Sequence, residues 1–135
     1  MTKLINIFMN HSEASNRIKD KILPIFSSLG YDISRIYRQD AEYNFVIGGD
    51  GTFLHAVHNS YFSNIPFVGI NTGHLGFYQE IDANNIDCYM QRLFNHEYLT
   101  DTLSLLECTV ETDAWTYTLK AVNEFVIKPV DPHLL

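Results

Sequence analysis

Short apolar runs alternate along this chain with stretches whose apolar residues recur at helical spacing. Leu4 to Met9, Phe45 to Ile47 and Phe67 to Ile70 are apolar enough for buried strands, and Ile33 to Tyr37 is a weaker run of the same kind. Strands that alternate with helices pair in parallel, with right-handed crossovers. The pattern therefore predicts an α/β fold, with a Rossmann-like parallel sheet, for residues 1–100.

Helical spacing is visible in three segments. The first carries one apolar stripe, made by Ile18, Ile22, Ile25, Phe26 and Leu29. Gly30 is a suitable stop for this helix, whereas Pro24 inside it removes a backbone donor and predicts a kink or an early break. The second helix is predicted to begin near Thr52. The third includes Ile86, Met90, Leu93 and Phe94, with Asp82 or Asn84 as the expected cap.

The pattern changes near residue 100, from alternating strands and helices to strands alone. Leu103 to Glu111 and Trp115 to Val122 are predicted strands joined by a turn at Thr112-Asp113, and Phe125 to Ile127 is a third. Alternating apolar residues in the second strand favour an antiparallel hairpin. We therefore predict an α/β domain over residues 1–100, followed over 101–135 by the beginning of a β-rich domain.

The apolar run that ends at Ile47 leads directly into Gly48-Gly49-Asp50-Gly51-Thr52. Glycines let the backbone turn sharply and bring its N–H groups close to a phosphate, and the start of the following helix would attract the same anion. A carboxylate would repel phosphate, so Asp50 fits this loop only if it faces a hydroxyl or a metal. The motif predicts phosphoryl transfer. The alternative is a Gly/Asp-rich turn without a ligand.

Composition limits the classes of partner. Apolar residues make up 46% of the chain and charged residues 19%, which is typical of a globular protein, and the net charge is −7. Such a charge argues against nonspecific binding to nucleic acid or to an anionic membrane. Cys88 and Cys108 lack metal or redox spacing and are expected to be reduced and mostly buried. Because the sequence shows neither a signal-peptide pattern nor a membrane-spanning run, we expect a cytoplasmic protein.

Two further motifs follow in a fixed order. Asn71-Thr72-Gly73-His74-Leu75-Gly76-Phe77 comes after the run that ends at Ile70, and Asn123-Glu124 interrupts an apolar run near the end. With the glycine motif they resemble the NAD kinase family over essentially the whole chain. That resemblance implies transfer of the terminal phosphoryl group of ATP, or of polyphosphate, to the adenosine 2′-hydroxyl of NAD. It also implies homo-oligomers, with Mg²⁺ or another divalent cation as the expected ion.

The resemblance also assigns roles to residues. Asp50 matches the catalytic aspartate, which orients the hydroxyl and accepts its proton. The residues expected to contact the nucleotides are Asp50, Gly51, Thr52, His55, Asn71, Phe77, Asn123 and Glu124. His55, on the first turn of its helix, stands where the family often has a cation. No metal site is predicted at the protein itself, since His55 and His58 lack a third ligand with a characteristic spacing.

Alternatives remain for single residues and for the whole chain. Thr52 could act only as a helix cap, Phe77 could belong to the core, and Asn123-Glu124 could be a polar strand end. The glycine motif alone is shared with diacylglycerol-type lipid kinases, and a noncatalytic nucleotide-binding or assembly module is a further possibility. The family plan continues beyond Leu135, so we expect a fragment of an NAD kinase whose unfinished β-rich part self-associates.

Overall fold

The computed structural model describes residues 3–72, 81–82 and 85–122. It divides into two compact units, residues 1–100 and 101–135. The described elements of the first unit are β1 (Lys3–Met9), α1 (Glu13–Ser28), β2 (Tyr31–Ser34), β3 (Tyr43–Gly48), α2 (Asp50–Asn59), β4 (Phe67–Asn71), β5 (Ile81–Asp82) and α3 (Ile86–Phe94). The strands form one sheet in the order β2-β1-β3-β4-β5, with parallel pairing throughout. The predicted parallel α/β fold is confirmed.

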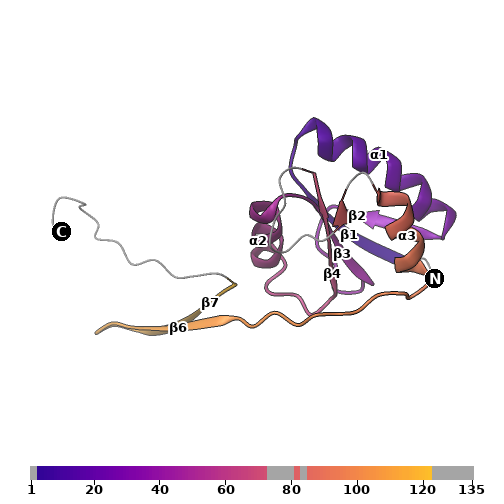
Figure 1. The fold of residues 1–135 in the computed structure, drawn as a ribbon. Helices are drawn as coiled ribbons and strands as arrows, with labels where there is room; N and C mark the ends of the chain where they lie inside the picture. Colours follow the sequence, from indigo (N-terminus) through magenta and orange to yellow (C-terminus); the bar gives the residue numbers. More distant parts are fainter. Residues whose placement is uncertain (1–2, 73–80, 83–84, 123–135) are drawn as a thin grey trace. The chain divides into compact units, whose positions relative to one another are not determined.

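The main core lies between the sheet and the helices α1 and α3, which cover one face while α2 covers the opposite face (Figure 1). Phe26 of α1 is fully buried, and its ring contacts Phe45 of β3 and Phe94 of α3 edge-on. Every residue of β3 is buried, as expected for a central strand with helices on both faces. Burial on both sides explains why Phe45 to Ile47, within this strand, forms an uninterrupted apolar run.

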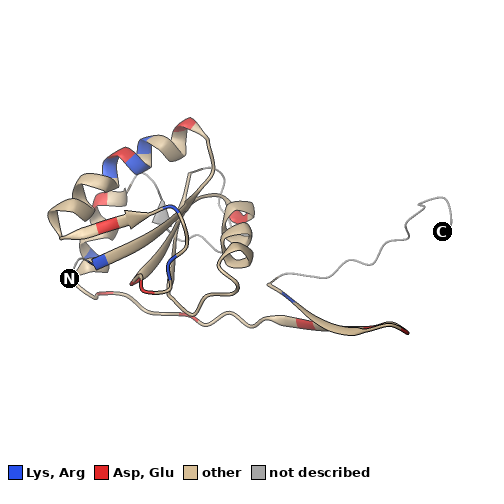
Figure 2. Ribbon diagram, turned by 180° about the vertical axis from the view of Figure 1, so that it is seen from behind, with Lys and Arg blue, Asp and Glu red and all other residues tan. Residues whose placement is uncertain are grey.

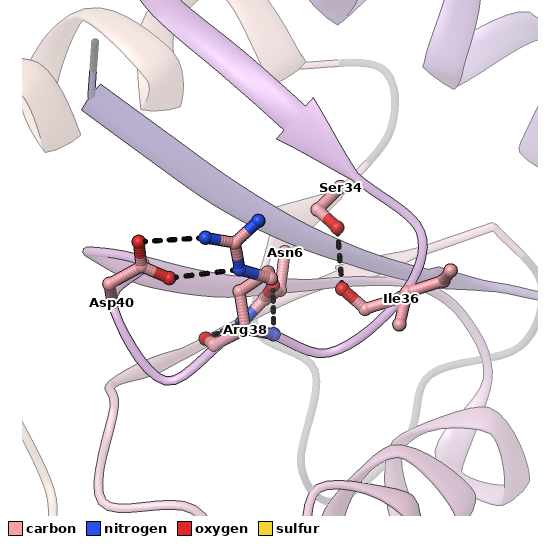
Figure 3. Close-up of polar contacts among 5 residues, drawn as sticks. All are labelled: Asn6, Ser34, Ile36, Arg38 and Asp40. Carbon is pink, nitrogen blue, oxygen red and sulfur yellow. Dashed lines mark hydrogen bonds and ion pairs between the residues drawn. The ribbon is translucent and has the colours of Figure 1, made fainter.

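The connection from β2 to β3 is held by a buried amide. Asn6 of β1 accepts a hydrogen bond from the Arg38 N–H (3.0 Å) and donates from Nδ2 to the Arg38 carbonyl (2.9 Å) and to Oδ1 of Asn44 (2.9 Å). Figure 3 shows Arg38 next to this contact, with its guanidinium paired to Asp40 at 3.1 Å. The buried amides of Asn6 and Asn44 thus find partners within the protein, as buried polar groups require.

Three details differ from the sequence predictions. The early break at Pro24 is wrong, because α1 continues to Ser28; Pro24 is exposed, so the carbonyl that loses its partner can bind water. The second strand starts at Tyr31, because the Tyr31 ring packs on Phe26 and Phe94 in the core. The residue at the cap position of α3 is Asn85, without a side-chain cap bond.

The cysteine expectation also needs correction at one position. Both cysteines are free thiols, but Cys88 is exposed on α3, and Cys108 is half-buried. Cys88 is not part of the apolar stripe of α3, whose buried residues are Ile86, Met90 and Leu93. Cys88 therefore lies on the solvent-exposed face of α3.

The second unit contains an antiparallel hairpin of β6 (Leu106–Glu111) and β7 (Thr116–Ala121). The Thr112 N–H bonds the Trp115 carbonyl at 2.8 Å, so the predicted hairpin and turn are confirmed. The facing pairs Leu106–Ala121, Cys108–Leu119 and Val110–Tyr117 alternate along the hairpin with the polar pairs Glu107–Lys120, Thr109–Thr118 and Glu111–Thr116. The hairpin is therefore amphipathic. The predicted strand Phe125 to Ile127 lies outside the described residues.

Basic and acidic residues are interspersed along α1, as the blue and red segments of its ribbon show (Figure 2). The helices in the described part of the chain include none with the length and apolar character of a transmembrane span.

Candidate active site

The glycine motif begins at the last residue of β3, at the point in the sheet where the order of strand addition reverses. From β1 the chain crosses to β2 on one side, and from β2 it returns to β3 on the other side of β1, so the connections that leave the carboxyl ends of the adjacent strands β1 and β3 lead in opposite directions along the sheet. In open α/β sheets, ligands bind beyond the strand ends at such a switch point. The register places Met9 beside Ile47 and Gly48 beside Asn71. The ends of β1, β3 and β4 therefore meet around Gly48–Asp50.

Gly48 is required by its immediate surroundings. Its φ is +154°, and a Cβ added to it would lie 2.6 Å from Thr52 Oγ1 and 3.1 Å from Asn10 Nδ2. Real Cβ atoms essentially never make a contact as close as 2.6 Å, so a side chain at position 48 would force Thr52 to move. Gly49 and Gly51 differ, because a Cβ at either would meet no atom within 4 Å. The space beside each of these two glycines is thus open in the described structure.

Helix α2 starts at Asp50, two residues before the predicted start. Gly49 occupies the cap position without a side-chain cap bond, and the Phe53 N–H makes the first intrahelical bond, to the Gly49 carbonyl at 3.1 Å. The alternative that Thr52 acts only as a helix cap is therefore wrong, and its predicted nucleotide contact stays a prediction. Thr52 lies within the first turn, where its side chain packs over Gly48. Asp50 and the backbone amides of the first turn both lie at the start of α2. The amides could bind an anion there, and the Asp50 carboxylate could accept a hydrogen bond from a hydroxyl next to it.

A cluster of small polar side chains joins the three strand ends, and the sequence interpretation missed it. Ser15, fully buried in the first turn of α1, donates to Asn10 Oδ1, and its Oγ lies 3.3 Å from Thr72 Oγ1 and 3.5 Å from the Ile47 carbonyl oxygen. Ser12 caps α1 by accepting from the Ser15 N–H at 3.1 Å. The available signal was the place of Asn10 and Ser12 directly after a buried strand.

The other predicted site residues are placed as follows. Asn71 is the buried last residue of β4, paired in register with Gly48, so the first two motifs meet. His55 is exposed in the second turn of α2, not in the first, and shares a helix face with Gly51 four residues before it. The His58 ring packs against the Phe62 ring, with 4.9 Å between the ring centroids. Phe77, His74, Asn123 and Glu124 lie outside the described residues.

Among the described residues, no group of three or more His, Cys, Asp or Glu side chains is close enough to hold a metal ion. At a phosphoryl-transfer site, Mg²⁺ takes one or two protein carboxylates and most of its remaining ligands from phosphates and water. Asp50 is a carboxylate of that kind at the glycine turn.

These features define a doubly wound α/β domain with a glycine-rich strand-to-helix turn at its switch point. The family of ATP-NAD kinase N-terminal domains matches residues 7–98, which is more than half of the chain. The chain therefore belongs to the ATP-NAD kinase family.

Individual relatives agree with this assignment. The chain is 44% identical to the NAD kinase of Finegoldia magna over 140 residues, which covers 99% of this chain and 50% of the relative. It is 34% identical to the NAD kinase of Leuconostoc mesenteroides over 127 residues, covering 92% of this chain and 47% of the relative. The chain thus spans about half the length of these curated relatives.

Solved structures share the fold at low sequence identity. Yeast NADH kinase in complex with NADH superimposes with a TM-score of 0.70 at 15% identity, covering 89% of this chain and 46% of the yeast chain. The NAD kinase of Archaeoglobus fulgidus in complex with ATP gives a TM-score of 0.53 at 15% identity, covering 78% of this chain and 40% of the archaeal chain.

Proposed function

We propose that this chain forms the N-terminal part of an NAD kinase site, which transfers the terminal phosphoryl group of ATP or polyphosphate to the 2′-hydroxyl of the NAD adenosine ribose. The observation that carries the proposal is the meeting of Gly48–Asp50 with Asn71 at the switch point of a chain that belongs to the ATP-NAD kinase family. Relatives named NAD kinases, and structures of relatives with NADH and with ATP, support these ligands.

Asp50 is the proposed catalytic base. Its backbone is fixed by the first turn of α2, and the preceding turn is fixed by the close approach of Gly48 and Thr52. A carboxylate held in this way can orient the attacking hydroxyl and accept its proton as the bond to phosphorus forms. Positioning of this kind supplies much of the rate enhancement in phosphoryl transfer.

The open side of Gly49 and Gly51 is the proposed approach for the nucleotides. Without side chains at these two positions, a ligand can come close to the backbone at the start of α2. His55, exposed on the same face as Gly51, can add positive charge near a phosphate when protonated. Thr52, Asn71, Phe77, Asn123 and Glu124 complete the proposed set of contacts.

A divalent ion, when bound with the nucleotide, would neutralise phosphate charge. Asp50 is the described carboxylate at the turn and could contact such an ion through its oxygens.

The β-rich remainder of the site and the assembly of copies are further parts of the proposal. The chain spans about half of its relatives, so we propose that the hairpin β6–β7 belongs to the β-rich part of the kinase and contributes to homo-oligomers.

The test is product formation by the complete gene product. Incubation with NAD, ATP and Mg²⁺ should give NADP, identified by an NADP-specific dehydrogenase, and replacing ATP by polyphosphate identifies the donor. Diacylglycerol as the acceptor is the comparison for the lipid-kinase alternative. Phosphorylation of diacylglycerol but not of NAD would contradict the proposal, as would the absence of either product.

A further inference from the structure

We propose that Ser15 is a positioning residue of this site, which holds the ends of β1, β3 and β4 in the arrangement that the Gly48–Asp50 turn needs. The inference rests on the proposed function for its activity measurement. Ser15 itself does not reach the open side of the turn, because it is fully buried.

The position of Ser15 explains why one hydroxyl can act on three strands. It lies in the first turn of α1, directly above the carboxyl end of β1, and its side chain points back to the strand ends. Its Oγ is in contact with Asn10 from β1, the carbonyl of Ile47 from β3 and the hydroxyl of Thr72 from the end of β4. Because the hydroxyl has one proton, it can donate either to Asn10 or to the Ile47 carbonyl oxygen 3.5 Å away, and the much closer Asn10 is its acceptor.

The chemistry of the partners fixes the direction of these bonds. The Ser12 N–H donates to Asn10 Oδ1 at 3.2 Å, so that atom is the amide oxygen, and the Ser15 hydroxyl must donate to it. Having given its one proton to Asn10, Ser15 Oγ can only accept, from the Thr72 hydroxyl at 3.3 Å and from the Ser12 hydroxyl, which lies 3.0 Å away. The bonds therefore run in one direction, from Thr72 through Ser15 to Asn10.

This direction turns Asn10 toward the glycine turn. With Oδ1 held by Ser12 and Ser15, Nδ2 is on the other side of the amide, 3.1 Å from the place that a Gly48 Cβ would occupy. Two backbone bonds complete the join: the Asn10 N–H to the Ile47 carbonyl at 3.3 Å, and the Thr72 N–H to the Gly48 carbonyl at 3.2 Å. Removing the Ser15 hydroxyl would therefore loosen both neighbours of the turn that carries Asp50.

The test compares Ser15→Ala with Ser28→Ala, a matched control in the same helix whose exposed hydroxyl bonds only the Ile25 carbonyl. In the complete gene product, Ser15→Ala should lower kcat by about 10- to 100-fold, the size expected of a misplaced reacting group. KM for NAD and ATP should stay within about threefold, because the nucleotide contacts remain. Ser28→Ala should change neither constant.

A second measurement does not depend on activity. In the 135-residue chain, hydrogen exchange at the Asn10 and Thr72 amides should be about fivefold faster in Ser15→Ala, the effect of losing roughly one hydrogen bond. If the wild-type product makes no NADP, the proposed function fails, and this measurement alone decides the positioning role. Unchanged exchange at both amides in a folded Ser15→Ala would overturn it.

A third measurement tests the route through Thr72. Because Ser15 and Thr72 share one bond, kcat of the double variant Ser15→Ala/Thr72→Val should be within about twofold of the weaker single variant. A loss of kcat in the double variant equal to the product of the two single losses would contradict the coupling between Ser15 and Thr72. If Ser15→Ala does not fold, Ser15→Cys, which has a similar size but a weak donor, takes its place. A kcat loss that disappears on cooling to a temperature where the variant is fully folded would also overturn the proposal.

Discussion

Gly48 and Thr52 touch across the turn from β3 to α2, so closely that a Cβ on Gly48 would lie 2.6 Å from the Thr52 hydroxyl oxygen. The first and last positions of the glycine motif therefore pack against each other, while Gly49 and Gly51 between them face open space. This difference separates a glycine needed by the fold from glycines that leave room for a ligand.

We predict that Gly48→Ala destabilises the chain, whereas Gly49→Ala does not. Alanine at position 48 forces Thr52 or Asn10 to move, which should lower the free energy of unfolding by about 1–3 kcal/mol. Alanine at position 49 meets no atom and should change it by less than about 0.5 kcal/mol. Urea unfolding followed by circular dichroism measures both. Equal effects of the two substitutions would contradict the assigned difference.

Asp50→Asn should retain the shape of the turn and remove the base. We expect turnover by the complete gene product to fall by about 10²–10⁴-fold, the usual contribution of a positioned acid or base. The dissociation constant for NAD, measured by calorimetry, should change far less. Glu13→Gln, at an exposed position in the first turn of α1, is the control with the same loss of charge. Near-normal turnover in Asp50→Asn would remove Asp50 from its proposed role.

Asn6→Ala should loosen the β2–β3 connection. The substitution leaves the Arg38 N–H and carbonyl and the buried Asn44 Oδ1 without their partner, so we expect a loss of about 1–3 kcal/mol in the free energy of unfolding. Asp40→Ala, which breaks only the exposed pair with Arg38, should cost less than about 1 kcal/mol. Denaturant unfolding of the three proteins in parallel checks the order. A larger effect at Asp40 would show that the exposed pair holds the connection.

Alkaline pH should destabilise the fold through Tyr31. Burial, and then the hydrogen bond to Glu42, raise the pKa of Tyr31 to about 12. Because an unfolded tyrosine ionises near pH 10, the unfolded state loses its proton first. The stability due to Tyr31 is therefore complete below about pH 10 and is lost as the pH rises toward 12. Unfolding free energies measured across this range should decline less steeply in Tyr31→Phe.

The control for this measurement is Tyr61→Phe, since Tyr61 is 87% exposed. It should leave the slope unchanged. Burial also raises the pKa of Tyr43, so part of the decline should persist in Tyr31→Phe. A wild-type stability that is constant from pH 10 to pH 12 would contradict the prediction.

The apolar face of the hairpin should drive self-association or leave the segment poorly ordered in the isolated chain. Leu106, Tyr117 and Leu119 lie on this face and are each more than two-fifths exposed. Apolar surface left in water forfeits about 25 cal/mol per Å². Leu119→Lys should lower the apparent mass in light scattering, while Thr118→Lys on the polar face should not. A monomer with strong exchange protection from Leu106 to Ala121 would contradict both expected states.

The sequence predicted those parts of the fold that depend on the pattern of residues close together in the chain. The strand Phe45 to Ile47 was recognisable because helices cover both of its faces, and the hairpin was recognisable because one face is apolar and the other polar. The start of α2 was misplaced because it depends on how Thr52 packs over Gly48, which no residue pattern expresses. Asp50 and Asn71 were chosen from motifs, and the register pairs Asn71 with Gly48, two residues before Asp50.

The polar cluster around Ser15 could not be predicted in the same way. Its partners Ile47 and Thr72 are 32 and 57 positions away, so only the completed sheet brings them together. In sequence, Ser15 is an ordinary polar residue at the start of a helix. The second strand was misplaced for a related reason, since Tyr31 owes its position to Phe94, a residue of another helix.

The parallel sheet also affects the order in which the chain can fold. The strand pairs among β1, β2, β3 and β4 join distant segments, as Asn6 and Asn44 do across 38 positions, so none of these pairs can form before a long loop closes. The hairpin β6–β7 needs only a tight turn and can form in about 1–10 μs. Pairing of β6 with β7 should therefore precede the assembly of the sheet in residues 1–100 during refolding, and the apolar face of the hairpin is exposed from that stage on. Refolding yield should consequently fall as protein concentration rises.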